Sequence, residues 1–296
     1  MSSLFNTKLQ IYAYLLCLLM NFAQASDNKF INFDLNKTIV YSRYDGISNK
    51  ILLYDINKNF ILFNVNNLKI DLIRNYSDDL ISSFYFYDNK IYTVFQNGDF
   101  VIFDDKINVL LKKSVLNFTK NIDKIYFNKN KIYIVYDYKN LLIFDITTDS
   151  KKNIQNIQKI NSLSFSNDTF CVAGWNKMVE CDESKIMKFK SRNILTSLFY
   201  CAYQNEFIAG DIDGNIYFLL ENSKFSISNF SPIKDITCSK KNYFISTDNK
   251  EIYVLKDKEM SLLTKEDSEI IDIFIDKNDK LIFVNKNGSI KLYNKI

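Results

Sequence analysis

The chemistry open to this chain is limited by a missing residue type, because none of its 296 residues is histidine. That absence excludes Ser-His-Asp and Cys-His nucleophilic schemes, histidine-ligated zinc and histidine-dependent haem attachment. Carboxylate pairs, tyrosine or lysine chemistry and oxygen-ligated calcium remain. No catalytic constellation is visible among these residue types. We therefore expect a binding or assembly protein, not an enzyme, with no cofactor.

The best candidate for a cation site is the segment Asp211-Ile212-Asp213-Gly214-Asn215, which offers oxygens at alternate positions as calcium loops do. Asp-Gly is also favourable chemistry for the tight turn of a hairpin. A calcium loop needs a bidentate acid at its twelfth position, and Asn222 stands there. We therefore expect a hairpin turn and no metal at this segment.

Four cysteines follow the N-terminal apolar segment. Cys171 and Cys181 flank a predicted hairpin turn, so a cross-strand disulfide could form between them in an oxidising compartment. Cys201 and Cys238 fall at equivalent sites of neighbouring repeats. There we expect two small buried side chains between the repeats and not a bridge.

The N-terminus has the features of a signal for export. Lys8 precedes the apolar run Ile11–Met20, and Ala23-Gln24-Ala25 has the small-x-small pattern that a signal peptidase accepts. An uncleaved anchor is the competing interpretation, but this run is much shorter than the ~20 residues of a membrane-spanning helix. We expect a signal peptide at residues 1–25, cleavage after Ala25, and a periplasmic mature protein with no membrane span.

Residues 26–296 are predicted to form one large β domain. The chain has one proline, Pro232, and no Gly/Ser-rich or charge-block linker that would mark a boundary.

The net charge is +4, with lysines and acidic residues interspersed along the whole length. That pattern is typical of a solvated surface and not of a basic face for phosphates. We expect a monomer that binds a protein partner and no nucleic acid.

A unit of short β-branched and aromatic segments, separated by Asn, Asp and Gly turns, recurs through the mature chain. Four antiparallel strands per ~40 residues is the period of a propeller blade. The sequence therefore predicts an all-β fold, a seven-bladed β-propeller with four antiparallel strands per blade. The predicted blades lie near residues 38–74, 80–114, 122–157, 160–190, 194–228, 233–264 and 270–296.

The last unit ends one strand short, whereas the alternating segment 29–35 is left over before the first full unit. We expect this segment to pair as the outermost strand of the last blade and so to close the ring, which would satisfy backbone groups that an open ring exposes.

The third strands of five units share one pattern of a polar turn followed by alternating apolar residues. They read NGDFVIFD (97–104), KNLLIFD (139–145), DGNIYFLLE (213–221), NKEIYVLKD (249–257) and NGSIKLYN (287–294).

This pattern resembles the end of WD40-type repeats and of the related quinoprotein-like periplasmic propellers, over essentially the whole mature chain. The Gly-His half of the WD40 signature is absent. Trp175 is the single tryptophan, so the regular tryptophan motifs of quinone-dependent propeller dehydrogenases are missing as well. Among exported propellers of this length, the chain is most similar to the WD40-like accessory proteins encoded with periplasmic nitrate reductases, the NapL type. The resemblance implies a non-catalytic role in such a system.

In a propeller, the turns between second and third strands share one face with the connections between blades. We expect this face to bind the partner, since aromatic side chains are enriched at protein interfaces. The residues predicted for it are Tyr138, Trp175, Asp211, Asp213, Phe118 and Phe230.

Asn36 lies in Asp34-Leu35-Asn36-Lys37-Thr38, which matches the acid-x-Asn-x-Thr acceptor of bacterial N-glycosylation.

Two other functions stay open at this point. One is a propeller enzyme or a small-ligand or cation-binding protein that uses central carboxylates. The other is a secreted eukaryotic propeller.

Overall fold

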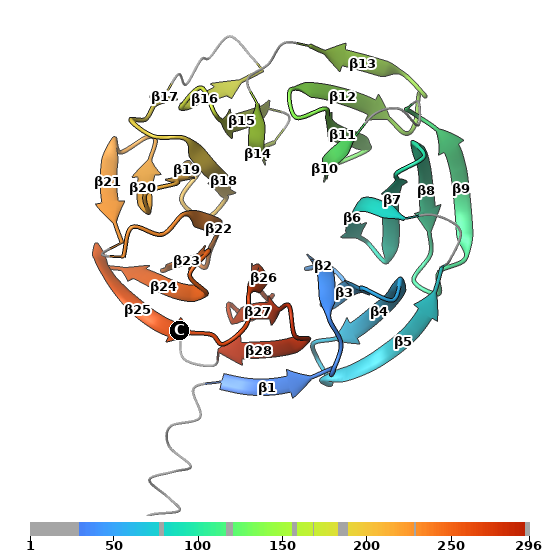
Figure 1. Ribbon diagram of the computed structural model, residues 1–296, viewed down its shortest axis with the longest axis horizontal. Coiled ribbons are helices and arrows are strands. Elements are labelled where there is room, and N and C mark those ends of the chain that lie inside the picture. Colours follow the sequence, from blue (N-terminus) through green and yellow to red (C-terminus); the bar gives the residue numbers. More distant parts are fainter. Residues whose placement is uncertain are drawn as a thin grey trace, which may run out of the picture.

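The computed structural model describes residues 30–76, 80–116, 121–155, 159–167, 169–182, 189–227 and 229–293. Within them the chain forms seven antiparallel sheets of four strands each, arranged as blades around a central axis (Figure 1). This confirms the predicted all-β, seven-bladed propeller. The signal peptide and Phe118 lie outside the described residues.

In each blade the first strand along the chain lies nearest the axis, and the following strands lie progressively further out (Figure 1). Blades 1 to 4 contain β2 (Ile39–Asp45), β3 (Lys50–Asp55), β4 (Asn59–Asn64) and β5 (Lys69–Asn75); β6 (Ile81–Tyr87), β7 (Lys90–Phe95), β8 (Asp99–Phe103) and β9 (Val109–Ser114); β10 (Ile122–Asn128), β11 (Lys131–Tyr136), β12 (Asn140–Asp145) and β13 (Lys151–Ile154); and β14 (Ile160–Ser166), β15 (Thr169–Gly174), β16 (Met178–Cys181) and β17 (Phe189–Lys190).

Blades 5 to 7 follow the same order, except that the outermost strand of blade 7 comes from the N-terminal part of the chain. They contain β18 (Leu195–Cys201), β19 (Glu206–Asp211), β20 (Asn215–Phe218) and β21 (Ser223–Ser226); β22 (Ile233–Cys238), β23 (Tyr243–Thr247), β24 (Glu251–Lys256) and β25 (Glu259–Lys265); and β26 (Ile270–Ile275), β27 (Leu281–Asn285), β28 (Ser289–Tyr293) and β1 (Phe30–Asp34).

The core of the molecule lies between blades, because each sheet packs face to face against its neighbours. The second strands are buried on both faces, as in β3, β11 and β19, and therefore read as nearly continuous apolar runs. One cluster joins blades 1 and 2, where the Phe60 and Phe84 rings lie 6.0 Å apart. The outer strands β5 and β9 are mostly exposed, so their sequences are more polar.

The ring is closed by β1, as the surplus segment predicts. β1 pairs antiparallel with β28 from Phe30 opposite Tyr293 to Asp34 opposite Ser289. Phe33 then packs against Phe63 of blade 1, with 4.9 Å between the ring centroids. One short strand thus fastens the last blade to the first.

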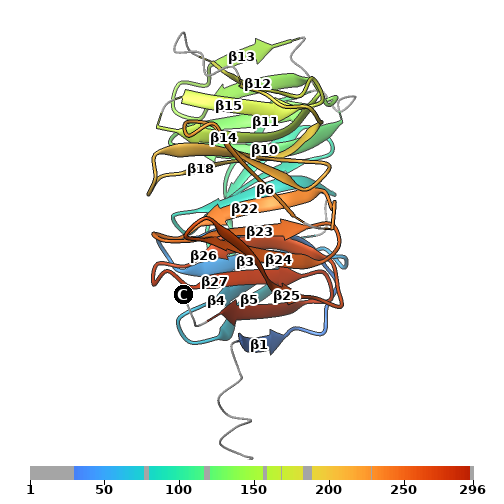
Figure 2. The same cartoon turned by 90° about the vertical axis from the view of Figure 1, so that its left-hand side faces the viewer.

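The strands run across the thickness of the disc, so the turns gather on its two faces (Figure 2). One backbone hydrogen bond recurs in all seven blades: the residue after the second strand donates its N–H to the carbonyl of the residue before the first strand. Trp175 to Lys159 (3.1 Å) and Ile212 to Ile194 (3.0 Å) are two examples. These bonds place the second-to-third turns beside the connections between blades, on what we call the connection face. The remaining turns form the opposite face.

Candidate partner-binding face

A lysine lies between two exposed aromatic rings on the connection face. The Nζ atom of Lys159 is 4.1 Å from the ring centroid of Trp175 and 4.9 Å from that of Tyr138. Trp175 is 51% exposed and Tyr138 is 54% exposed. A cation over a ring face is attracted by the negative electrostatic potential of that face, which holds the three side chains as one group spanning blades 3 and 4.

The main chain fixes this group. Tyr138 has a positive φ of 64° and follows Asp137 at 48°, which is the left-handed pair of a tight hairpin turn. The Tyr138 N–H donates to Asp123 Oδ2 at 2.7 Å, and its carbonyl accepts from the Ile160 N–H at 2.8 Å. The tyrosine is therefore held outward by backbone geometry, on a turn with both main-chain groups bonded.

Apolar exposure continues around the ring from this group. Ile212, in the equivalent turn of blade 5, is 41% exposed, and Phe230, in the connection from blade 5 to blade 6, is 79% exposed. Tyr138, Trp175, Ile212 and Phe230 together form what we call the apolar arc, over blades 3 to 6. Asp213 lies exposed beside Ile212. Aromatic side chains that project from rigid turns suit protein recognition, because little conformational entropy is lost when they are buried.

Asp211 does not belong to an exposed surface, and the sequence-based assignment is corrected here. It is completely buried. Its Oδ1 accepts the N–H groups of Asp213 (3.0 Å) and Asn215 (2.8 Å), and its Oδ2 accepts from Tyr217 OH (2.8 Å). The carboxylate therefore organises its own turn and is not free for a partner or a cation. Among the residues that the structure describes, no group of three acidic or cysteine side chains could hold a metal ion.

Both cysteine pairs are bridged. Cys171 and Cys181 are opposite each other on β15 and β16, with Cα atoms 4.0 Å apart. Cys201 and Cys238, which we expected to be unbridged, form a second disulfide between blades 5 and 6 with Cα atoms 6.0 Å apart. Their equivalent positions on neighbouring inner strands bring them within the usual Cα separation for a bridge, a distance that the sequence does not contain.

A pair of acidic residues on the inner strands was missed by sequence reasoning. Asp235 of β22 and Asp272 of β26 hydrogen-bond through their side chains, and Asp272 Oδ2 accepts from Arg43 Nη1 of β2 at 2.8 Å. Burial and the neighbouring Asp272 carboxylate raise the pKa of Asp235 well above its ordinary value. Burial also raises the pKa of Asp272, against the opposing charge of Arg43. Together with Arg43, the pair joins blades 6, 7 and 1.

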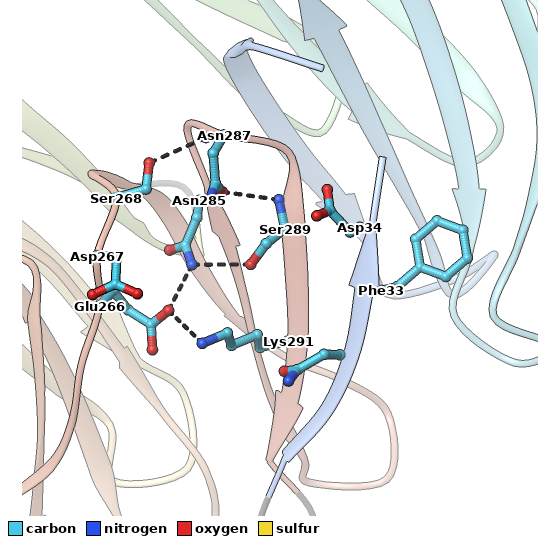
Figure 3. A pocket seen from close by; sticks show the side chains of 10 residues that line it. Phe33, Asp34, Glu266, Asp267, Ser268, Asn285, Asn287, Ser289 and Lys291 are labelled. Atoms are coloured by element: carbon cyan, nitrogen blue, oxygen red, sulfur yellow. Dashed lines mark hydrogen bonds and ion pairs between the residues drawn. The ribbon is translucent and has the colours of Figure 1, made fainter. Parts of the chain in front are cut away.

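A polar pocket of about 210 Å³ lies where β1 closes the ring (Figure 3). It contains an ion pair between the buried Glu266 and the partly exposed Lys291, at 2.7 Å, and the amide of Asn285. The pocket is lined by Asn32, Phe33, Asp34, Glu266, Asp267, Ser268, Asn285, Asn287, Ser289 and Lys291.

Asn36 is exposed in the connection from β1 to β2, with a positive φ of 52°, and its N–H donates to Asp34 Oδ1 at 2.8 Å. Glycosylation there stays a prediction.

None of the described segments forms a helix long and apolar enough to cross a membrane.

The architecture defines a seven-bladed β-propeller, and solved structures share it. One similar chain belongs to the crystal structure of the Mitotic Checkpoint Complex, with a TM-score of 0.74, 10% identity, and coverage of 90% of this chain and 91% of that one. Another is the computationally designed Ika8 protein, with a TM-score of 0.68, 12% identity, and coverage of 88% and 98%. At these identities the likeness concerns the fold alone. The sequence matches no protein-family model and no curated protein.

Proposed function

We propose that this protein is a non-catalytic scaffold that binds a protein partner through the apolar arc. The observation that carries the proposal is the Tyr138–Lys159–Trp175 group, in which two half-exposed rings are held outward on bonded turns. Rigid aromatic anchors of this kind are the residues most often found at the energetic centre of interfaces. A partner that covers the arc with its own apolar side chains would remove these rings from water.

We further propose that the protein works in the bacterial periplasm after export. The two disulfides support this, since disulfides persist in oxidising compartments and are rare in reducing ones. The signal pattern of residues 1–25 points the same way. A role beside a periplasmic nitrate reductase, as in the NapL-type proteins, is the specific form of this proposal.

The fold is consistent with a scaffold. A propeller of similar structure is part of the Mitotic Checkpoint Complex, an assembly of proteins. A propeller presents rigid turns on two broad faces, so that partner choice depends on turn side chains and not on the sheets.

Co-purification with matched variants tests the proposal. The tagged full chain would be isolated from its native envelope fraction as wild type, as Tyr138→Ala/Trp175→Ala, and as Tyr203→Ala. Tyr203 is an equally exposed tyrosine (57%) on the opposite face. We expect the same partner with wild type and Tyr203→Ala and its loss from the double variant. Equal recovery with all three would refute the assignment of the arc.

A further inference from the structure

The pocket beneath β1 replaces apolar packing with buried charge. The Glu266 N–H donates to the Lys250 carbonyl at 2.8 Å, and Ile227 and Val115 make the same bond in blades 5 and 2. At those two positions the buried side chains are aliphatic. Glu266 instead carries a carboxylate into the contact between blades 6 and 7. Because a buried charged group is often less stabilising than apolar packing, the buried Glu266 carboxylate points to a role other than stability.

The ion pair itself is satisfied. Glu266 Oε2 accepts from Lys291 Nζ and from Asn285 Nδ2, each at 2.7 Å, and Glu266 Oε1 accepts from Thr264 Oγ1 at 3.1 Å. Asn285 Nδ2 also donates to Ser289 Oγ at 3.2 Å. The two donations fix the orientation of the amide (Figure 3), and among the described residues Asn285 Oδ1 has no hydrogen-bond partner. Asn285 is only 2% exposed, so an unmade bond there is costly.

The backbone N–H groups of the turn that follows Asn285 donate to acceptors other than Asn285 Oδ1. In blade 5 the equivalent Asp211 accepts two N–H groups of its turn. In blade 7 the corresponding groups are bonded differently: Asn287 N–H donates to Ser268 Oγ at 3.1 Å, and Ser289 N–H donates to Asn287 Oδ1 at 3.1 Å. Asn285 Oδ1 is thereby left as a buried acceptor without a partner, on a residue that lines the pocket.

The charge of the pocket selects the kind of donor. Glu266 and Lys291 neutralise each other, which leaves the exposed carboxylates of Asp34 and Asp267. Lys250 Nζ lies nearby, but it donates to the carbonyl of Asp267 at 2.9 Å. The lining therefore combines two carboxylates with an unused amide oxygen, which together suit a cation that also donates hydrogen bonds.

We propose that this pocket binds a primary ammonium group, carried by a small amine or by a lysine side chain. The ammonium would donate to Asn285 Oδ1 while Asp34 and Asp267 supply the opposite charge. The site is separate from the apolar arc, so the inference goes beyond the scaffold function and does not depend on it.

Thermal unfolding of the full mature chain with defined probes tests the proposal. The probes are propylammonium for a free amine and Nα-acetyl-lysine methylamide for a lysine side chain, with tetramethylammonium as a cation that cannot donate. A ligand of the folded state raises Tm, by about 3 °C at ~10 times its Kd for a domain of this size. We expect this rise with at least one of the two amine probes and not with tetramethylammonium.

Two single substitutions localise the effect. Asp267→Asn removes one pocket carboxylate and should abolish most of the rise, whereas Asp257→Asn, an exposed turn aspartate on the opposite face, should leave it unchanged. The proposal is overturned if neither amine exceeds tetramethylammonium, if Asp267→Asn leaves the rise intact, or if Ca²⁺ alone raises Tm.

Discussion

Removing the Cys201–Cys238 disulfide should cost this propeller more stability than removing the Cys171–Cys181 disulfide. The first bridge spans 37 residues of sequence and joins two blades, whereas the second spans 10 residues within one blade. A bridge stabilises chiefly by restricting the unfolded chain, and the restriction grows with the logarithm of loop length. The loop-entropy relation gives about 4 kcal/mol for the longer loop and about 3 kcal/mol for the shorter one.

Urea unfolding of alanine variants measures both values. Either single variant, Cys201→Ala or Cys238→Ala, already breaks the inter-blade bridge, so each should lose most of the about 4 kcal/mol. The double variant should lose little more than one single variant, because the bridge can be lost only once. The same cycle on Cys171 and Cys181 supplies the matched comparison, and unfolding under a reducing agent should bring all the proteins close together.

Two results would refute this reasoning. If the two single losses add up in the double variant, Cys201 and Cys238 act as separate packing residues and not as a bridge. If a reducing agent leaves the wild-type midpoint unchanged, the bridges contribute nothing to stability, and the structural support for an oxidising compartment is lost.

Three further predictions concern closure, charge and backbone. Deleting residues 26–36 should lower Tm sharply, since it removes β1 and its pairing with β28; an unchanged melt would contradict closure. The folded pKa of Asp235 is raised, so the stability this group contributes is present at low pH and is lost as pH rises through that pKa. Asp235→Asn should remove this part of the pH dependence in a wild-type minus variant comparison of unfolding free energies; identical profiles would argue against the raised pKa. Gly288→Ala should lower the free energy of unfolding by about 1–3 kcal/mol in urea unfolding. The reason is that Gly288 has a φ of +91° and an added Cβ would lie 2.4 Å from the Lys37 carbonyl oxygen. Gly46→Ala serves as the control, because its Cβ would meet only Tyr44 Cε1 at 3.7 Å.

The fold could be predicted because its determinants are local. Each blade shows the same alternation of apolar strands and Asn, Asp or Gly turns, and those turns indeed hold residues at positive φ, such as Asp88 (49°) and Asn89 (55°). The surplus segment before the first unit pointed to closure because the last unit lacked its fourth strand.

The site could be predicted only where a residue's exposure follows from its turn. Trp175 and Phe230 are exposed, as their places in a turn and a connection suggest, but Asp211 is buried by a hydrogen-bond network that a turn sequence does not reveal. Lys159 appeared in no motif, and its position between two rings depends on the packing of blade 3 against blade 4.

Contacts between neighbouring blades whose residues are far apart in the sequence were beyond sequence reasoning for the same reason. Arg43 and Asp272 are 229 positions apart, and they meet only because the ring closes. The disulfide between Cys201 and Cys238 likewise depends on a distance between sheets. Such contacts need the angle between blades, which no local pattern encodes.

Site-specific photo-crosslinking in intact cells tests directly whether a protein partner binds at the apolar arc. A photoreactive residue would replace Trp175 in one variant and Tyr203 in another, since the two side chains are similarly exposed on opposite faces. We expect a crosslink to one defined protein from position 175 and none to that protein from position 203. Equal crosslinking from both positions, or crosslinking from 203 alone, would contradict a partner bound at the apolar arc.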